Sequence, residues 1–180
     1  IVQGNVPQDQ KWDPEHAGAI FARYLRLTRE VMTQGADLVL WPESSTPFSY
    51  GRSAETAQLQ VLAREHGVPI LLGSDYWERD GDAVRVYNAA FLLGPDGQTR
   101  GLYRKVRLVP FGEYVPLRSL LFFARPLVQA VSDFSPGTEV NTLPLDGAAV
   151  STAICYEVVY PALIREGVLN GSELLTTITN

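Results

Sequence analysis

Residues 148–161 read AAVSTAICYEVVYP, an apolar, β-branched run that ends at Cys155-Tyr156-Glu157 and gives way to a helix-like pattern. The first half predicts a buried strand, because β-branched side chains fit a pleated surface. α/β domains collect their working side chains where strands end. The stretch therefore indicates an α/β fold with Cys155 at the end of a strand, which is where a nucleophile would be placed.

The rest of the chain alternates between helix and strand patterns. Asp13-Pro14 predicts a helix start, and apolar residues at three-and-four spacing carry that helix to Gly35. A second helix is predicted over roughly residues 53–66, closed by Gly67. Buried or paired strands are predicted at residues 37–41, 69–74, 84–93, 98–105, 139–145, 148–154 and 173–180. The turn sequences GPDG and Asp146-Gly147 join four of these segments into two hairpins.

Composition describes one compact domain. The 180 residues are 46% hydrophobic and 19% charged, which is typical of a chain that folds around a single sizeable core. A formal net charge of −5 argues against a nucleic-acid partner, for which a basic face is expected. The single cysteine excludes an internal disulfide, so the redox compartment cannot be read from cysteine usage.

Taken alone, Cys155 is more simply a small buried side chain, the commonest setting of a free cysteine. Its position at the start of a helix pattern favours a thiolate instead, because unpaired N–H groups gather there. A nucleophilic thiol needs a base, and the two histidines, His16 and His66, lie in charged, helix-like surroundings. Two other residues follow strand-like runs, Glu43 in ADLVLWPESS and Lys105 in GLYRKVRLVPFGEY. We therefore predict Glu43 as the base and Lys105 as the cation that stabilises an oxyanion.

Lysine usage supports this assignment. The chain has two lysines against thirteen arginines, so a lysine among arginines suggests that a compact ammonium group is required. Glu113 and Glu157 are predicted to orient Lys105 and keep it charged. The alternatives are a solvated loop residue for Glu113 and a favourable first-turn charge for Glu157. Tyr156 either shapes the pocket or makes a packing contact, and its backbone N–H is a candidate second oxyanion donor.

Four strings, VQGNVPQDQKW, WPES, YRKVRLVPFGEYVP and ICYE, resemble the nitrilase-like (carbon-nitrogen hydrolase) domain of bacterial apolipoprotein N-acyltransferases. Elsewhere in the nitrilase superfamily a different loop usually follows the lysine, and Tyr-Asp often follows the cysteine. The resemblance implies a four-layer αββα sandwich, which sequence pattern alone does not distinguish from other layered α/β folds. It also implies catalytic roles for Glu43, Lys105 and Cys155 without any cofactor or metal.

The activity implied by the resemblance is an acyl transfer. A phospholipid would give its acyl chain to Cys155 as a thioester, and the N-terminal amine of a diacylglyceryl-cysteine lipoprotein would take it as an amide. The implied location is the bacterial inner membrane, with the catalytic domain on the periplasmic side and at the membrane surface. Two other functions stay open: a soluble nitrilase-superfamily amidase that hydrolyses a small amide, and an inactive nitrilase-like lipid- or protein-binding module. Retention of all three motif residues argues against the second.

The resemblance also predicts how much of the parent protein this chain represents. Residues 1–180 are expected to be a fragment holding the catalytic domain, incomplete at its C-terminal end and without the membrane helices of the parent protein. The apolar segment VPLRSLLFFARPLVQAV, residues 115–131, is too short to span a bilayer and is interrupted by Arg118, Arg125 and Pro126. It is either an arm at the membrane surface or a core helix.

Overall fold

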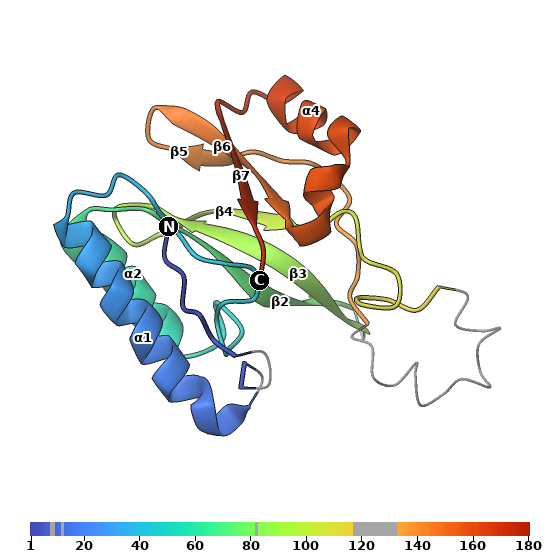
Figure 1. Ribbon diagram of the computed structural model, residues 1–180. Coiled ribbons are helices and arrows are strands. Elements are labelled where there is room, and N and C mark those ends of the chain that lie inside the picture. The colour runs from blue at the N-terminus through green and yellow to red at the C-terminus, as the bar shows by residue number, and fades with distance from the viewer. Residues whose placement is uncertain (8–9, 12, 82, 117–132) are drawn as a thin grey trace.

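The computed structural model describes residues 1–7, 10–11, 13–81, 83–116 and 133–180. Two helices cover one face of a four-stranded sheet, whose other face packs on a three-stranded sheet with a further helix outside it (Figure 1). The layer order is thus helix, sheet, sheet, helix. The predicted α/β class and the αββα sandwich implied by the resemblance are both confirmed.

Helix α1 spans Pro14–Thr33 and begins as the sequence predicts, since the Asp13 side chain accepts a hydrogen bond from the Glu15 N–H at 2.9 Å. Helix α2 spans Glu55–His66 and ends at Gly67, whose φ of 65° is the left-handed conformation that glycine adopts most easily. Local capping signals therefore position both helices.

The four-stranded sheet has the order β1-β2-β3-β4 and is antiparallel except for the β1–β2 pair. Its strands are β1 (Val39–Leu40), β2 (Ile70–Asp80), β3 (Ala83–Leu93) and β4 (Thr99–Arg104). β2 runs beyond the predicted residues 69–74, because pairing with β3 along its whole length keeps the polar second half extended. The predicted β3–β4 hairpin is confirmed.

The three-stranded sheet has the order β5-β6-β7, with β5 (Leu143–Leu145), β6 (Ala148–Ile154) and β7 (Leu174–Ile178). β5 and β6 form the predicted hairpin, and β7 is parallel to β6. The connection between β6 and β7 differs from the helix expected directly after the strand. Residues Cys155–Val159 form a short 3₁₀ helix, η2, and helix α4 (Pro161–Leu169) starts only at Pro161, where proline suits the first helical turn.

Side-chain alternation along the central strands divides the interior into two cores. Ile70 and Leu72 of β2 face helices α1 and α2, whereas Leu71 between them faces the second sheet. On β3, Phe91 and Leu93 belong to the helix side, and Ala90 and Leu92 to the inter-sheet layer. By the same alternation, Asp75 of β2 and Asn88 of β3 face the second sheet.

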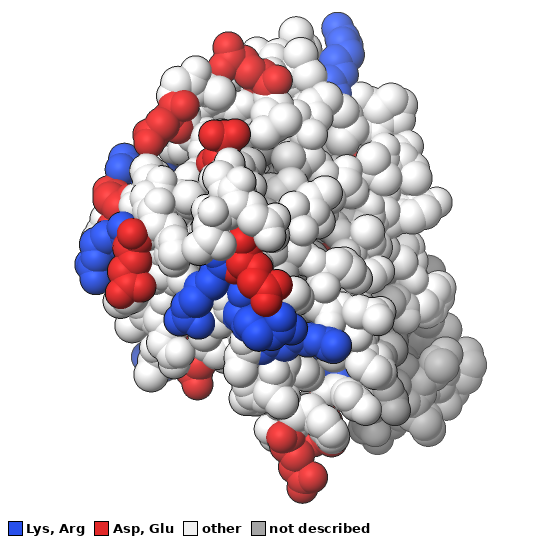
Figure 2. Space-filling model, turned by 60° about the vertical axis from the view of Figure 1, so that its left-hand side comes forward, with Lys and Arg blue, Asp and Glu red and all other residues white. Residues whose placement is uncertain are grey.

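The described residues contain no helix with both the length and the apolar content to cross a bilayer. Of the segment 115–131, all but Val115 and Pro116 lie outside the described residues, so the membrane arm and the core helix both stay predictions. The face seen in Figure 2 carries acidic and basic side chains interspersed among uncharged ones. Salt largely screens the interactions of such exposed charges beyond about one Debye length.

Candidate active site

The register of the four-stranded sheet assembles one side of the site. Asp75 of β2 lies directly opposite Asn88 of β3, and Lys105, next after β4, donates its N–H to the Asn88 carbonyl at 2.9 Å. Directly opposed residues of an antiparallel pair point to the same face. A row of polar side chains therefore lies at one end of the inter-sheet layer.

Glu43 joins this row from the turn after β1. The turn is fixed on β2 by the Ser45 N–H, which donates to the Gly73 carbonyl at 3.0 Å. A Cβ atom at Gly73 would lie 2.6 Å from the Pro42 carbonyl oxygen and 2.7 Å from Glu43 Cα. Glycine at residue 73 thus lets the backbone that carries Glu43 cross closely over β2.

Glu43, Asn88, Lys105 and Glu113 form a buried four-group cluster. The Lys105 Nζ donates to Oε1 of Glu113 at 2.8 Å and to Oε1 of Glu43 at 3.3 Å. The Asn88 Nδ2 donates to the same two oxygens, at 2.8 Å for Glu43 and 2.7 Å for Glu113. Lys105 is 1% exposed and each carboxylate 9%. Each donor therefore bridges both acids in a site with little water.

Glu113 is held by its own loop as well as by Lys105. Its Oε2 accepts the Val109 N–H at 2.9 Å, and its backbone N–H donates to the Val109 carbonyl at the same distance. The alternative of a solvated loop residue is wrong, since Glu113 is buried and bonded to Lys105. The predicted orienting role of Glu113 has the geometry that it requires.

The charge of Lys105 is stabilised by its surroundings. Burial alone lowers the pKa of this ammonium, but the Glu113 hydrogen bond and the electrostatic interactions with Glu43, Glu113 and Cys155 outweigh burial and raise it. Lys105 therefore stays protonated and offers a fixed positive charge.

Cys155 faces this cluster from the other sheet. It follows β6 as the first residue of η2, is half-buried against the inter-sheet core, and contributes to the raised pKa of Lys105. Its φ of 55° is a left-handed conformation that costs a non-glycine residue about 1–2 kcal/mol. Ser44, beside Glu43, and Phe111, near Glu113, also have positive φ, at 43° and 61°. Of the four non-glycine residues with positive φ in the described ranges, three thus lie at or beside the site, and the fourth is Asn5.

Of the two predicted uses of Glu157, the structure supports the acid in the first turn of the following helix, since Glu157 lies in the first turn of η2. It is fully buried. Its carboxylate accepts the Tyr103 hydroxyl at 2.9 and 3.0 Å and the N–H groups of Val106, Arg107 and Ile154 at 2.7, 2.9 and 2.9 Å. These bonds do not include the Lys105 ammonium, which the orienting role required. Burial and the Glu157 charge together raise the pKa of Tyr103. Glu157 therefore ties η2 to the backbone just after Lys105.

Tyr156 is 54% exposed, and its ring meets the Tyr160 ring edge-on at a centroid distance of 6.0 Å. This is the packing contact that was one of its two predicted uses. The pocket-shaping role and the backbone N–H as an oxyanion donor stay predictions.

Sequence reasoning missed Asn88 and Lys11. The Lys11 Nζ donates to the Glu43 carbonyl oxygen at 3.2 Å, and the side chain is 8% exposed. Burial lowers the pKa of Lys11, an effect that the nearby charges of Glu43 and Asp75 oppose. Both lysines of the chain thus contact Glu43. In the described ranges, no group of three or more His, Cys, Asp or Glu side chains is arranged to hold a metal ion.

Comparison with known proteins adds family information to this geometry. A family model described as carbon-nitrogen hydrolase matches residues 1–180. The apolipoprotein N-acyltransferase of Geobacter metallireducens is 41% identical over 182 residues, which cover 100% of this chain and 35% of that protein. The apolipoprotein N-acyltransferase of Aquifex aeolicus is 32% identical over 180 residues, which cover 100% of this chain and 39% of that protein. The chain therefore spans little more than a third of these curated relatives.

Solved structures agree on the fold. A carbon-nitrogen hydrolase from Helicobacter pylori G27 superimposes with a TM-score of 0.66 and 18% identity, over 91% of this chain and 55% of that one. An amidase from Nesterenkonia sp. gives a TM-score of 0.64 and 23% identity, over 93% of this chain and 60% of that one. At this level of identity the likeness concerns the fold alone.

Proposed function

Because this chain belongs to the carbon-nitrogen hydrolase family, we propose that residues 1–180 are the catalytic domain of an apolipoprotein N-acyltransferase. The observation that carries the proposal is the buried cluster in which Lys105 bonds both Glu43 and Glu113, with Cys155 in electrostatic range. The similarity of the whole chain to enzymes of that name supports the choice within the family. The membrane helices of the enzyme would lie in other parts of the protein.

The first half of the reaction acylates the cysteine. Glu43 takes the proton of Cys155, and the thiolate attacks an ester carbonyl carbon of a phospholipid. The Lys105 ammonium, with the Tyr156 N–H as second donor, stabilises the oxyanion. When the intermediate collapses, the C–O bond breaks and the lysophospholipid alkoxide takes the proton from Glu43. The products are a lysophospholipid and a Cys155 thioester.

The second half transfers the acyl chain to nitrogen. The N-terminal amine of a diacylglyceryl-cysteine lipoprotein attacks the thioester carbonyl, and Lys105 stabilises the second oxyanion in the same position. A C–N bond forms as the C–S bond breaks, and Glu43 passes a proton from the amine to the departing thiolate. An amide-linked acyl chain and free Cys155 result.

These substrates place the enzyme at a membrane. Both the acyl donor and the acyl acceptor are anchored in lipid, so the proposed location is the bacterial inner membrane, with this domain on the periplasmic side. The partners are then a phospholipid and a lipoprotein at the membrane surface, with no nucleic acid.

Two other functions share features with this one. A soluble amidase would use the same thioester and let water resolve it, and amidases are among the proteins that share the fold. Similarity to acyltransferases over the whole chain favours the lipoprotein amine instead. An inactive binding module would have no use for two buried carboxylates around one ammonium, an arrangement that costs desolvation energy.

The test uses the full-length protein that contains this chain, incubated with phospholipid. We expect a mass increase of one acyl chain on Cys155, absent from a Cys155→Ser variant. Addition of a synthetic lipopeptide with an N-terminal S-diacylglyceryl-cysteine should discharge the adduct into an N-acyl peptide. Release of free fatty acid alone would favour the amidase-type reaction. Failure to form any adduct in an active preparation would rule out the covalent mechanism.

A further inference from the structure

Two neighbouring acceptors beside the cluster carry no hydrogen bond. Oδ1 of Asp75 and Oδ1 of Asn88 are both buried, and within the part of the chain that the structure describes neither has a donor. They belong to directly opposed residues on β2 and β3, so they lie on the same face of the sheet. Leaving a buried acceptor without a donor is unfavourable, and a ligand that supplies the donor is one explanation for such a pair.

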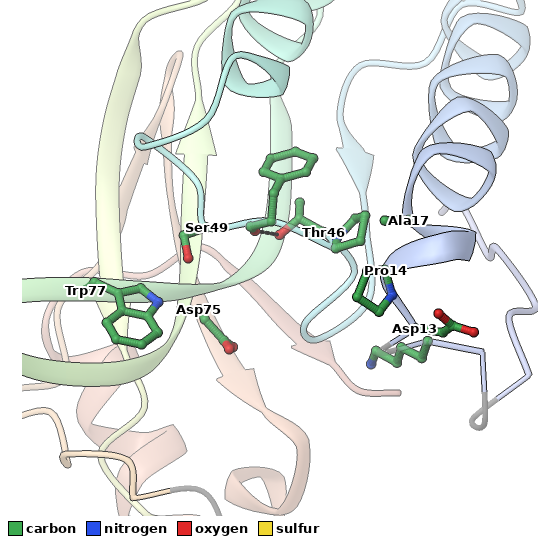
Figure 3. A pocket seen from close by; sticks show the side chains of 10 residues that line it. Asp13, Pro14, Ala17, Thr46, Ser49, Asp75 and Trp77 are labelled. Atoms are coloured by element: carbon green, nitrogen blue, oxygen red, sulfur yellow. Dashed lines mark hydrogen bonds between the residues drawn. The ribbon is translucent and has the colours of Figure 1, made fainter.

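Asp75 also lines a cavity of about 280 Å³. Figure 3 shows Asp75 and Trp77 of β2 on one side of this cavity and Asp13, Pro14 and Ala17 at the start of α1 on the other. Trp77 is 41% exposed, so the cavity reaches the surface. A small group entering here meets the Asp75 carboxyl group.

The charged groups around Asp75 come from several elements. Lys11 and Asp13 line the same cavity, and Glu43 and Glu113 act on Asp75 through their charges. Burial raises the pKa of Asp75 to about 6, an effect that Lys11 and a hydrogen bond from Ser44 oppose and that the two glutamates reinforce. Asp75 is therefore a carboxylate at neutral pH, yet it binds a proton more readily than an ordinary aspartate does.

The second half-reaction must remove two protons from the acceptor's ammonium group. An α-amino group has an ordinary pKa of about 7.7–8.0, so much of the acceptor arrives as R–NH₃⁺. One proton must leave before the nitrogen can attack, and another after the C–N bond has formed. Glu43 passes the later proton to the Cys155 thiolate, which leaves the earlier one without an acceptor in that scheme.

We infer that Oδ1 of Asp75 and Oδ1 of Asn88 bind the acceptor's ammonium group, and that Asp75 takes the first proton. This assignment rests on the proposed acyl transfer. The ammonium gives one proton to the Asp75 carboxylate, and the free lone pair attacks the thioester carbonyl carbon. The second amine proton goes through Glu43 to the Cys155 thiolate, and Asp75 returns its proton to solvent.

The test separates the two half-reactions in the full-length protein. The rate at which phospholipid acylates Cys155 is measured by mass, and the rate at which the lipopeptide discharges the purified adduct is measured in a second step. For Asp75→Asn we expect the ratio of discharge rate to acylation rate to fall more than tenfold. The matched control is Asp96→Asn, which makes the same change at an exposed turn residue paired with Arg100.

The pH dependence gives an independent readout. Since the Asp75 carboxylate must be ionised, wild-type discharge should decline as the pH falls below about 6. The discharge rate of Asp75→Asn should lack this step, while Asp96→Asn keeps it.

Two results would overturn the inference. An asparagine keeps the size and shape of the Asp75 side chain and removes only its charge, so a purely structural Asp75 predicts an unchanged ratio, and that is the first of them. An equal or greater loss of acylation in Asp75→Asn would also overturn it, because the residue would then act in the first half. Absence of any adduct in the wild type would instead remove the proposed function, and the inference with it.

Discussion

The two sheets contribute very different halves to the site. On the four-stranded sheet, Glu43, Asn88 and Lys105 are buried and bonded to one another. On the three-stranded sheet, Cys155 is half-buried, and Tyr156 after it is 54% exposed. The acid–amine half is thus built before substrate arrives, whereas the nucleophile half stands open to it. Preorganised charge needs no rearrangement as the reaction proceeds, which is the main source of electrostatic catalysis.

Glu157 is the link between these halves. It belongs to η2 on the nucleophile side, yet its carboxylate accepts N–H groups of Val106 and Arg107 on the other side. The comparison predicts different effects of substitution in the two halves. Changes in the acid–amine half should lower both stability and activity, whereas changes at the nucleophile should lower activity alone.

The largest effect is expected for Cys155→Ala. The acyl adduct should be lost completely, because no other residue of the chain carries a thiol. The thermal unfolding midpoint should change by no more than about 2 °C, since a half-buried side chain outside the cluster contributes little to stability. Mass spectrometry and a thermal melt of the full-length protein measure the two effects.

A glycine at residue 155 sharpens this prediction. The backbone at residue 155 has a φ of 55°, which glycine adopts without strain and alanine does not. The Cys155→Gly protein should therefore be at least as stable as the Cys155→Ala protein. A marked loss of stability in either variant would show that the nucleophile half is as tightly built as its counterpart.

Lys105→Met should come next. The acylation rate should fall by about 10³-fold, the usual cost of one oxyanion donor. The free energy of unfolding should fall by about 3–5 kcal/mol, because Glu43 and Glu113 lose their shared buried cation. Pre-steady-state acylation and denaturant unfolding are the measurements.

Lys105→Arg is the control for charge. It should recover part of the stability but little activity, since a planar guanidinium cannot take the position of a compact ammonium. Full activity with arginine would mean that charge alone, and not the shape of the ammonium, is required.

Glu157→Gln should have an intermediate effect. The glutamine NH₂ would meet N–H donors where the carboxylate accepted them, which should cost about 3 kcal/mol. Acylation should fall by about 10²-fold through misplacement of the backbone after Lys105, without loss of any reacting group. Glu166→Gln, on the exposed face of α4, is the matched control and should change neither quantity. A normal acylation rate in a destabilised Glu157→Gln protein would argue against the linking role.

Local signals in the sequence were enough for much of the fold. The Asp13 cap, the left-handed Gly67 and the Asp146-Gly147 turn act within a few residues, so helices and hairpins could be predicted from them. The second half of β2 could not, because its extended shape depends on pairing with β3. The start of α4 was predicted too early, because the apolar pattern after Cys155 does not distinguish a 3₁₀ turn from an α-helix.

The site residues that follow the ends of strands could be predicted from the sequence, and the other site residues were harder to predict. Glu43, Lys105 and Cys155 each follow a strand, whereas Asn88 lies within one, and its part in the cluster depends on sheet register. An asparagine inside VYNAAFLL was still a usable signal, since a buried polar residue in an apolar strand needs partners. Lys11 could have been found as the only other lysine. Nothing local indicates that Glu157 bonds a backbone segment fifty residues earlier.

The smallest expected effect is a pH-dependent change in stability on substitution of Asp75, which lies on the four-stranded sheet. The folded protein raises the pKa of Asp75 to about 6 from an ordinary value of 3.8, so ionised Asp75 destabilises the fold. Its unfavourable contribution is absent at pH values below 4 and grows as the pH rises to 6. Asp75→Asn should therefore raise the unfolding midpoint by a few degrees at pH 7.5, equivalent to about 1–2 kcal/mol, and give no gain at pH 4. Asp96→Asn should show no such gain. If the stability difference between Asp75→Asn and the wild type did not change with pH, the ionised Asp75 carboxylate would not be the cause of the lower stability.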